Sequence, residues 1–282
     1  MTERVIAVGT PHIVLGIDPY INKIPPYYLN KQKDFIKAIE EWVKDLLVIC
    51  KDEVVGVKFQ MAFFEFLGSD GVKLCYELIK FAKEKNGYFV ILDAKRNDIP
   101  DISNVYAETY LSNNFIDAIT TTPYFGLDSL DTFLKCAQKY GKIIFVVVYS
   151  SNRGAMDIQK IKTPQEVEFW EYIVKKIYEV YREKRCIGFV IGATNPVVVR
   201  KVQDIFHNVW ILSPGFGPQG ADTSAWKNVY LKPVSNILFT LSRTLTIPDP
   251  VGHYTTRSLY INFVKDQLKM WKEILGSLYQ VS

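Results

Sequence analysis

The sequence Ile143-Ile144-Phe145-Val146-Val147-Val148-Tyr149 is the longest uninterrupted apolar run in the chain. It is far shorter than the roughly 20 residues of a membrane helix, and its β-branched content is typical of a strand that is covered on both faces. Seven further runs share this character: Ile13–Ile17, Val54–Phe59, Tyr88–Leu92, Phe115–Thr120, Ile187–Ile191, Val209–Leu212 and Ile237–Leu241. We therefore predict eight strands, and their continuous rather than alternating apolar residues indicate a parallel sheet.

Segments with the helical spacing of apolar residues separate these runs. They contain Phe35, Ile39, Trp42, Val43, Leu46 and Cys50, then Val167, Trp170, Val174, Ile177, Tyr178 and Tyr181, and finally Tyr260, Val264, Leu268, Trp271 and Leu275. Thr163-Pro164-Gln165-Glu166 has the sequence of a capping box and predicts that the second of these helices begins there. Eight alternations of strand and helix predict an α/β fold, a single (β/α)8 TIM barrel over residues 1–282. A doubly wound open sheet with fewer strands is the alternative.

The composition is that of a globular protein with nearly balanced charge. Among 282 residues, 34 Lys and Arg face 30 Asp and Glu, and a net charge of +4 is too small to favour nucleic acid or an acidic membrane as a partner. The first ten residues contain no apolar segment of the kind found in secretory signals. The four cysteines form no C-x-x-C pair, and His12, His207 and His253 have no metal-ligand spacing. We expect a cytoplasmic protein without a metal cofactor that binds neither nucleic acid nor membrane.

Charged and hydroxyl side chains gather where the predicted strands end. They are Asp18, Lys58, Asp93, Lys95, Asp98, Ser150, Ser151 and Arg243. In (β/α)8 barrels the functional residues lie at the C-terminal ends of the strands. A single charge at such an end is better explained as a solvated loop residue, but charges of both signs on the first three strands predict a functional site.

The end of the third strand is the most informative of these positions. Side chains alternate along a strand, so Asp93 and Lys95 share a face with Ile91. The carboxylates of Asp93 and Asp98 would keep Lys95 protonated, and a positioned ammonium can donate a proton to a carbanion. A salt-bridge cluster that seals the top of the barrel explains this stretch equally well.

A glycine-rich segment, Ser213–Asp222, follows the seventh strand. It contains G-x-G-x-x-G by count, the pattern of dinucleotide sites, but lacks the acidic residue that such sites carry about 20 residues further on. Barrels instead often bind phosphate with the loops after strands seven and eight. We therefore favour a phosphate monoester bound by the backbone N–H groups of this segment and by Arg243.

At these residues the chain resembles a known family. Asp93-Ala94-Lys95-Arg96-Asn97-Asp98-Ile99 is similar to the D-x-K-x-x-D motif of orotidine 5'-phosphate decarboxylases. Further matching segments follow in the order of that family, and they resemble its type 2 bacterial subfamily most closely. They are Thr122–Leu130, Ser150–Gly154, Ile191–Thr194, Pro214-Gly215-x-Gly217-x-Gln219-Gly220 and Ser242-Arg243. The hexad alone is shared with sugar-phosphate decarboxylases, whereas the ordered set is specific.

The resemblance implies a homodimeric (β/α)8 barrel that converts orotidine monophosphate to uridine monophosphate and CO2 in pyrimidine biosynthesis. It implies no metal and no organic cofactor. Electrostatic stabilisation must then supply most of the catalysis, because the electrons left at C6 have no sink.

The resemblance also assigns roles to residues. Asp18 and Lys58 would hold the ribose hydroxyls and orient Asp93, which would lie against the departing carboxylate. Lys95 would protonate the C6 carbanion, and Asp98 would reach into the site of the neighbouring subunit. The expected contacts with the pyrimidine and the phosphate come from Thr122, Ser151, Gln219, Gly220 and Arg243.

Three residues depart from the family pattern. Ile102 stands where a threonine commonly contacts the ribose from the partner subunit, Asn97 replaces a glycine, and Arg153 replaces a proline. Three other functions remain open on sequence grounds: a magnesium-dependent sugar-phosphate decarboxylase or aldolase, a catalytically silent nucleotide-binding barrel, and an NADP oxidoreductase.

Overall fold

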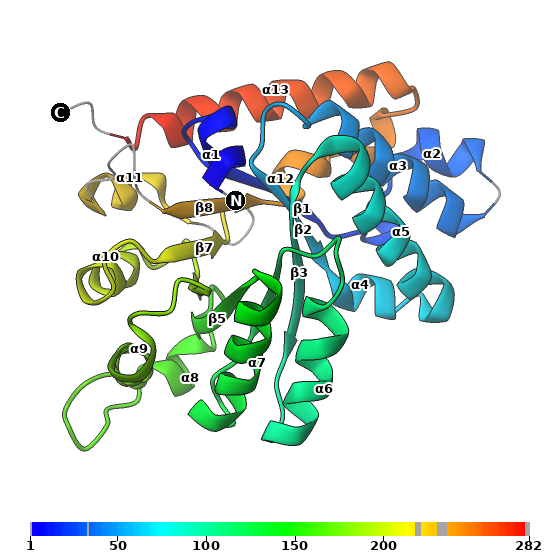
Figure 1. Cartoon of the computed structure of the whole chain (residues 1–282). Coiled ribbons are helices and arrows are strands. Elements are labelled where there is room, and N and C mark those ends of the chain that lie inside the picture. Colours follow the sequence, from blue (N-terminus) through cyan, green and yellow to red (C-terminus); the bar gives the residue numbers. More distant parts are fainter. Residues whose placement is uncertain (1, 33, 218–220, 230–235, 280–282) are drawn as a thin grey trace. The chain divides into compact units, whose positions relative to one another are not determined.

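The computed structural model describes residues 2–32, 34–217, 221–229 and 236–279. Its eight strands follow one another in chain order around a closed barrel, β1 to β8. Figure 1 shows the helices and strands coloured along the sequence. The predicted (β/α)8 fold is confirmed, and the open-sheet alternative is wrong. The chain divides into two compact units, which we call unit 1 (Met1–Asp93 and Thr240–Ser277) and unit 2 (Ala94–Phe239 and Leu278–Ser282).

Unit 1 holds the first strands and the helices that flank them. In chain order it contains α1 (Thr2–Val8), β1 (Ile13–Ile17), the 3-10 helix η1 (Ile21–Lys23), α2 (Pro26–Lys31), α3 (Phe35–Ile49), β2 (Gly56–Gln60), α4 (Met61–Glu65), α5 (Gly68–Asn86) and most of β3 (Phe89–Arg96). It continues with the end of β8 (Ile237–Leu241), α12 (Arg243–Thr246), η3 (Val251–His253) and α13 (Arg257–Gly276). The parallel register pairs Ile17 with Phe59 and Gln60 with Asp93, so β1 and β2 end side by side and β2 ends beside Asp93 of β3.

Two hydrogen bonds tie the long helices of unit 1 to the short helix after β8. The buried Trp42 of α3 donates from Nε1 to the hydroxyl of Tyr260 on α13 at 2.5 Å. That hydroxyl donates in turn to the carbonyl of Thr246 in α12 at 2.8 Å. The apolar faces predicted for α3 and α13 are buried around this chain of bonds, except for Phe35, which is 45% exposed. The bonds fix the element that begins at Arg243.

Unit 2 contains the middle strands. Its elements are α6 (Pro100–Leu111), β4 (Ala118–Thr121), α7 (Leu127–Tyr140), β5 (Ile143–Tyr149), α8 (Ala155–Gln159), α9 (Phe169–Tyr181), β6 (Ile187–Ile191), α10 (Pro196–Ile205), β7 (Trp210–Pro214), α11 (Thr223–Trp226) and η2 (Lys227–Val229). The strands β4 to β7 pair in parallel, and the register of β5 against β6 shifts between Val147 and Tyr149. This irregularity lies directly before Ser150 and Ser151.

The strand boundaries differ from prediction at four places. The strand predicted at Tyr88–Leu92 extends to Arg96, and three others are β2, β4 and β7 with the bounds given above rather than Val54–Phe59, Phe115–Thr120 and Val209–Leu212. Flanking residues such as Val54 and Val55 are buried without belonging to the sheet, because apolar runs report burial rather than strand pairing.

The helix start predicted at Thr163 is wrong. The helix α9 begins at Phe169, and the residues before it pair with one another instead. The backbone N–H and the hydroxyl of Thr163 both donate to the carbonyl of Val167, at 2.9 and 3.1 Å. Glu166 has a φ of 59°, in the left-handed region. Because the Thr163 side chain bonds within this turn, it does not cap a helix.

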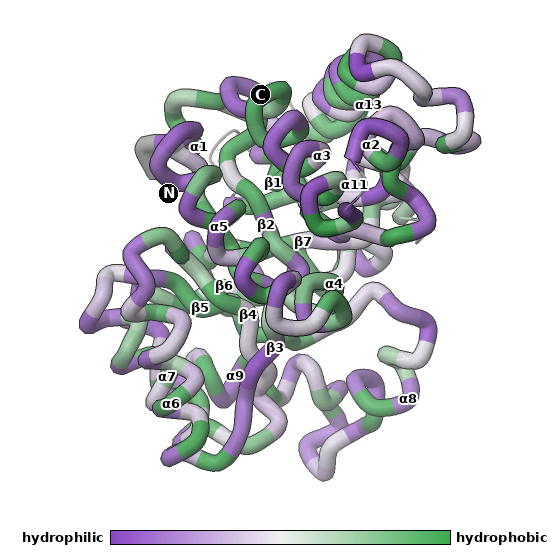
Figure 2. The backbone as a smooth tube through the Cα atoms, turned by 90° about the vertical axis from the view of Figure 1, so that its right-hand side faces the viewer, coloured by the Kyte–Doolittle hydropathy of each residue, from purple (hydrophilic) through white to green (hydrophobic). Residues whose placement is uncertain are grey.

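The hydropathy of the backbone agrees with the burial of the strands. Figure 2 shows β5 and β6 mainly in the hydrophobic colour, and all five residues of β6 are buried. Within the described residues, no helix is both long and apolar enough to span a bilayer.

Candidate active site

A buried ion pair lies at the ends of two neighbouring strands of unit 1. Lys58 of β2 places its Nζ 2.7 Å from Oδ2 of Asp93 on β3, and the two side chains are only 4% and 8% exposed. The amide of Gln60 donates to the same carboxylate oxygen at 3.1 Å. Asp93 is thus held from two directions by residues of the adjacent strand, as the register Gln60–Asp93 requires.

The carboxylates around Lys58 keep it charged. Burial alone would lower the pKa of its ammonium, but attraction by Asp93 and Asp18 and the hydrogen bond to Asp93 outweigh burial and raise this pKa above the ordinary lysine value. The group is therefore a fixed positive charge shielded from water, where electrostatic interactions are stronger than in solution.

Asp18 and Arg243 lie in the same unit as this pair. Asp18 directly follows β1, and its buried Oδ1 has no hydrogen-bond partner among the described residues. Arg243, the first residue of α12, holds its guanidinium 5.7 Å from the centre of the Tyr20 ring, within cation–π range. A side chain at Gly16 would collide with Ser242, so the glycine of β1 allows the chain next to Arg243 to approach.

Lys95 lies in unit 2, and its backbone is unusual. It belongs to β3 but has a φ of 48°, in the left-handed region that residues with a Cβ avoid. The regular alternation that would give it the face of Asp93 is therefore interrupted at this residue. The Lys95 side chain is exposed. Its N–H donates to the hydroxyl of Thr120 on β4 at 3.0 Å.

The segment after Lys95 is held by a network centred on Asn97. The Asn97 amide donates to the carbonyl of Thr122, and its Oδ1 accepts bonds from the N–H of Asp98 at 2.9 Å and the hydroxyl of Ser103 at 3.0 Å. Asp98 is half-buried and accepts the N–H of Ile99 at 2.7 Å. Asn97 was counted as a departure from the family pattern, and its structural role was missed. The sign of this role in the sequence was that an amide side chain stands where the family has a glycine.

The loop after β5 carries Ser151 against β6. A Cβ at Gly192 would lie 2.6 Å from the Cα of Ser151 and 2.7 Å from its nitrogen. The preceding Ser150 is fixed by Gln159, whose Oε1 accepts its N–H at 2.9 Å. The half-buried Ser151 is thus positioned by close backbone approach on one side.

The predicted phosphate segment is described only in part. Gln219 and Gly220 lie outside the described residues. Before them, Gly215 and Gly217 have φ values of 119° and 103°, which residues with a Cβ rarely adopt. Between them, the ring of Phe216 lies 5.4 Å from that of Phe239. This buried ring anchors the beginning of the glycine-rich segment within unit 2.

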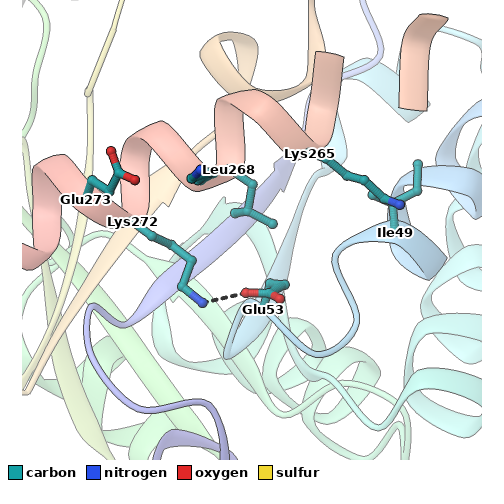
Figure 3. A pocket seen from close by; sticks show the side chains of 7 residues that line it. Ile49, Glu53, Lys265, Leu268, Lys272 and Glu273 are labelled. Carbon is teal, nitrogen blue, oxygen red and sulfur yellow. Dashed lines mark hydrogen bonds and ion pairs between the residues drawn. The ribbon is translucent and has the colours of Figure 1, made fainter. Parts of the chain in front are cut away.

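A separate pocket lies on unit 1 beside α13. It has a volume of about 480 Å³ and is lined by Ile49, Glu53, Lys265, Leu268, Lys269, Lys272 and Glu273. Figure 3 shows Lys272 pointing to Glu53, with which it forms an ion pair. None of the predicted site residues lines this pocket. Within the described part of the chain, no three His, Cys, Asp or Glu side chains are grouped as metal ligands.

Comparisons with known proteins agree on one family. The profile described as "Orotidine 5'-phosphate decarboxylase / HUMPS family" matches residues 11–236. The orotidine 5'-phosphate decarboxylase of Caldicellulosiruptor bescii is 33% identical over 234 residues, which cover 74% of this chain and 75% of that protein. The protein of the same name from Porphyromonas gingivalis is 29% identical over 247 residues, 87% of each chain. The solved structure of Leishmania donovani OMP decarboxylase superposes with a TM-score of 0.76 at 26% identity, over 98% of this chain and 96% of that one.

Proposed function

The chain belongs to the orotidine 5'-phosphate decarboxylase / HUMPS family, and from this membership we propose that it converts orotidine 5'-phosphate to uridine 5'-phosphate and CO2. The observation that carries the proposal is the buried pair of Lys58 and Asp93 at the strand ends, in a chain with the D-x-K-x-x-D motif. Fixed charges of this kind are what a decarboxylation without an electron sink requires.

In the proposed reaction the bond between C6 and the carboxylate carbon breaks and CO2 leaves. The electron pair stays on C6, and the Lys95 ammonium donates its proton there. Asp93 lies against the carboxylate, and its repulsion is relieved when CO2 leaves. No metal takes part. Lys95 regains a proton from solvent after uridine 5'-phosphate dissociates.

Binding of the remaining substrate groups is proposed for the other strand-end residues. The unpartnered Oδ1 of Asp18 supports a role as acceptor for a ribose hydroxyl, beside the ammonium of Lys58. Arg243 supplies a cation for the 5'-phosphate, together with Gln219 and Gly220. Ser151 and Thr122 are proposed to contact the pyrimidine. Because the carbonyl of Thr122 already accepts the Asn97 amide, the proposed contact of Thr122 is made by its side chain.

We propose a homodimer in which Asp98 serves the site of the partner subunit. The exposed apolar side chains of Ile99, which directly follows Asp98, and of Ile102 and Val105 in the first half of α6 support a buried interface there. Mixing inactive Lys95→Ala chains with inactive Asp98→Ala chains restores one intact site per mixed dimer. We expect activity to recover on mixing. Sedimentation of the protein as a monomer, together with no recovery of activity, would refute the dimer. A cytoplasmic location is proposed as well, in keeping with four free cysteines.

The activity is tested by ultraviolet absorbance of orotidine 5'-phosphate with the purified protein, with and without EDTA. We expect the orotate chromophore to disappear in both samples. Disappearance only without EDTA would refute the metal-free mechanism and favour a metal-dependent enzyme. An unchanged spectrum in both samples would overturn the proposed activity.

The role of Lys95 is tested in the same assay. Lys95→Ala is expected to abolish turnover while affinity for uridine 5'-phosphate stays within a few-fold, because the ammonium acts on the carbanion rather than on the product. Lys73→Ala, which removes an exposed lysine of α5, is the control and retains full turnover. Near-normal turnover of Lys95→Ala would refute proton donation by this residue.

A further inference from the structure

The backbone at Lys95 is held in a conformation that it would not adopt unaided. A φ of 48° crowds the Cβ of a non-glycine residue against the following carbonyl. Residues with such backbones persist only where their surroundings hold them, and they occur often at functional sites. The neighbours that hold Lys95 are therefore part of what directs its side chain.

Two threonine hydroxyls of β4 contact the backbone on both sides of this strained residue. Thr120 accepts the N–H of Lys95 through Oγ1 at 3.0 Å. Thr121 donates from Oγ1 to the carbonyl of Arg96 at 2.7 Å. Thr120 and Thr121 are 1% and 0% exposed, so water does not readily take the place of either hydroxyl.

The third threonine of the sequence Thr120-Thr121-Thr122 contacts the same segment. Its carbonyl accepts the side-chain amide of Asn97. Three consecutive residues, at the end of one strand and just after it, thus bind three consecutive residues, Lys95 to Asn97, at the end of the strand before it. Side chains perform these contacts where a regular sheet would use backbone groups alone.

We propose that Thr120 is a positioning residue for Lys95, and that its hydroxyl sets the direction of the ammonium by holding the Lys95 peptide. This inference rests on the proposed function of Lys95 as proton donor. Without the Thr120 hydroxyl, the N–H of Lys95 loses this acceptor and the residue can relax toward a right-handed or extended backbone. The side chain would then leave the reacting carbon, and a displacement of about 1 Å can cost about a hundredfold in rate.

The test compares three variants of buried threonines. Thr120→Val keeps the shape and removes the hydroxyl, Thr120→Ser keeps the hydroxyl, and Thr240→Val is the matched control. Thr240 lies on β8 and is 3% exposed, and its Oγ1 has no hydrogen-bond partner among the described residues. The control makes the same steric change without removing a known bond.

Thr120→Val is expected to lower kcat by about ten- to a hundredfold with KM and the affinity for uridine 5'-phosphate changed less than about threefold. Thr120→Ser is expected to restore most of kcat, and Thr240→Val to match the wild type. A kcat of Thr120→Val within twofold of the wild type would refute the inference. Equal losses in the Ser and Val variants would assign Thr120 to packing and refute it as well.

A crystal structure of Thr120→Val gives a readout that does not depend on activity. A Lys95 φ that has left the left-handed region supports the inference, and a φ still near 48° contradicts it. A wild-type protein that does not decarboxylate orotidine 5'-phosphate would overturn the proposed function itself. Failure of the function and failure of the positioning role are thereby distinguished.

Discussion

The buried pair of Lys58 and Asp93, which we place in the active site, should also contribute to the stability of the fold. Removing one charge of such a pair leaves the other unpaired in a medium that solvates it poorly. Asp93→Asn is therefore expected to lower the free energy of unfolding by about 3 kcal/mol at neutral pH. Urea unfolding followed by circular dichroism measures this loss. Glu40→Gln breaks the half-exposed pair with Lys44 and is the control, with an expected loss below about 0.5 kcal/mol. Equal losses in the two variants would contradict the buried pair.

The same pair predicts a pH dependence in the alkaline range. Because the folded protein raises the pKa of Lys58, the stabilisation by its charge is fully present below the ordinary lysine pKa of 10.5. It is lost as the pH rises above 10.5 toward the raised value. Relative to Lys58→Met/Asp93→Leu, the wild type should lose unfolding free energy more steeply above pH 10.5. Parallel curves for the two proteins would contradict this.

The backbone strain at Lys95 can be measured by comparing the stabilities of two variants that truncate its side chain. Lys95→Ala and Lys95→Gly both remove the charge, but only glycine relieves the crowding at a φ of 48°. Lys95→Gly should be more stable than Lys95→Ala by about 1 kcal/mol. The order should reverse at Lys73, an exposed position within α5, where alanine is favoured by about 1 kcal/mol. Greater stability of alanine at both positions would show that Lys95 is not strained.

Sequence reasoning identified charged residues more readily than the neighbours that hold them. Lys58 and Asp93 were predicted near one another because strand ends meet at one edge of a parallel sheet. Thr120 and Asn97 were missed as partners of the Lys95 segment, because their bonds depend on a left-handed φ that interrupts the strand. No propensity predicts a lysine in that conformation.

The position of Ser151 depends on the glycine at the end of a neighbouring strand. A Cβ at Gly192 would meet the backbone of Ser151 at 2.6 Å, so Gly192→Ala must displace the loop after β5. If Ser151 contacts the pyrimidine, this displacement should raise KM by about tenfold, corresponding to about 1.4 kcal/mol of lost binding. Steady-state kinetics measure the change. Gly154→Ala is the control on the same loop, because its Cβ would come no closer than 3.5 Å to other atoms. An unchanged KM for Gly192→Ala would refute the dependence.

Helices and strands were predicted well where the same spacing of apolar residues continued over several helical turns or along a whole strand. The buried faces of α3 and α13, apart from the exposed Phe35, and the full extent of β5 and β6 agree with the sequence patterns. The start of α9 was predicted wrongly, because a local turn around Thr163 competes with capping for the same side chain. A few local hydrogen bonds decide between the turn and the helix cap, and the spacing of apolar residues does not predict them.

At the scale of the whole molecule, the boundary between the two units falls inside β3 and β8. A strand cannot easily lose its pairing on one half and keep it on the other. We therefore predict that the chain unfolds as the single domain expected from its sequence, with one cooperative transition in urea. Tryptophan fluorescence and far-ultraviolet circular dichroism should give the same midpoint. Trp42 and Trp271 lie in unit 1, and Trp170, Trp210 and Trp226 lie in unit 2. Two separated transitions would refute the prediction.

The closed barrel followed from eight apolar runs, because each run needs cover on two faces and only a few architectures supply it. The glycine-rich segment after β7 was the weaker case. Its composition suits both a dinucleotide and a phosphate, and the residues that would decide between them, Gln219 and Gly220, lie outside the described residues. Glycine content alone does not specify the bound group.

Two buried free cysteines, Cys50 and Cys136, can report when the structure around them opens. Burial raises the pKa of Cys50 to about 12 and that of Cys136 to about 11, so at neutral pH the folded protein holds almost no reactive thiolate at either position. A thiol reagent can then modify them only as fast as the surrounding structure exposes them. Cys50 lies in unit 1 and Cys136 in unit 2, so a comparison of their two labelling rates shows whether the structure around both cysteines opens together, as a single cooperative transition requires.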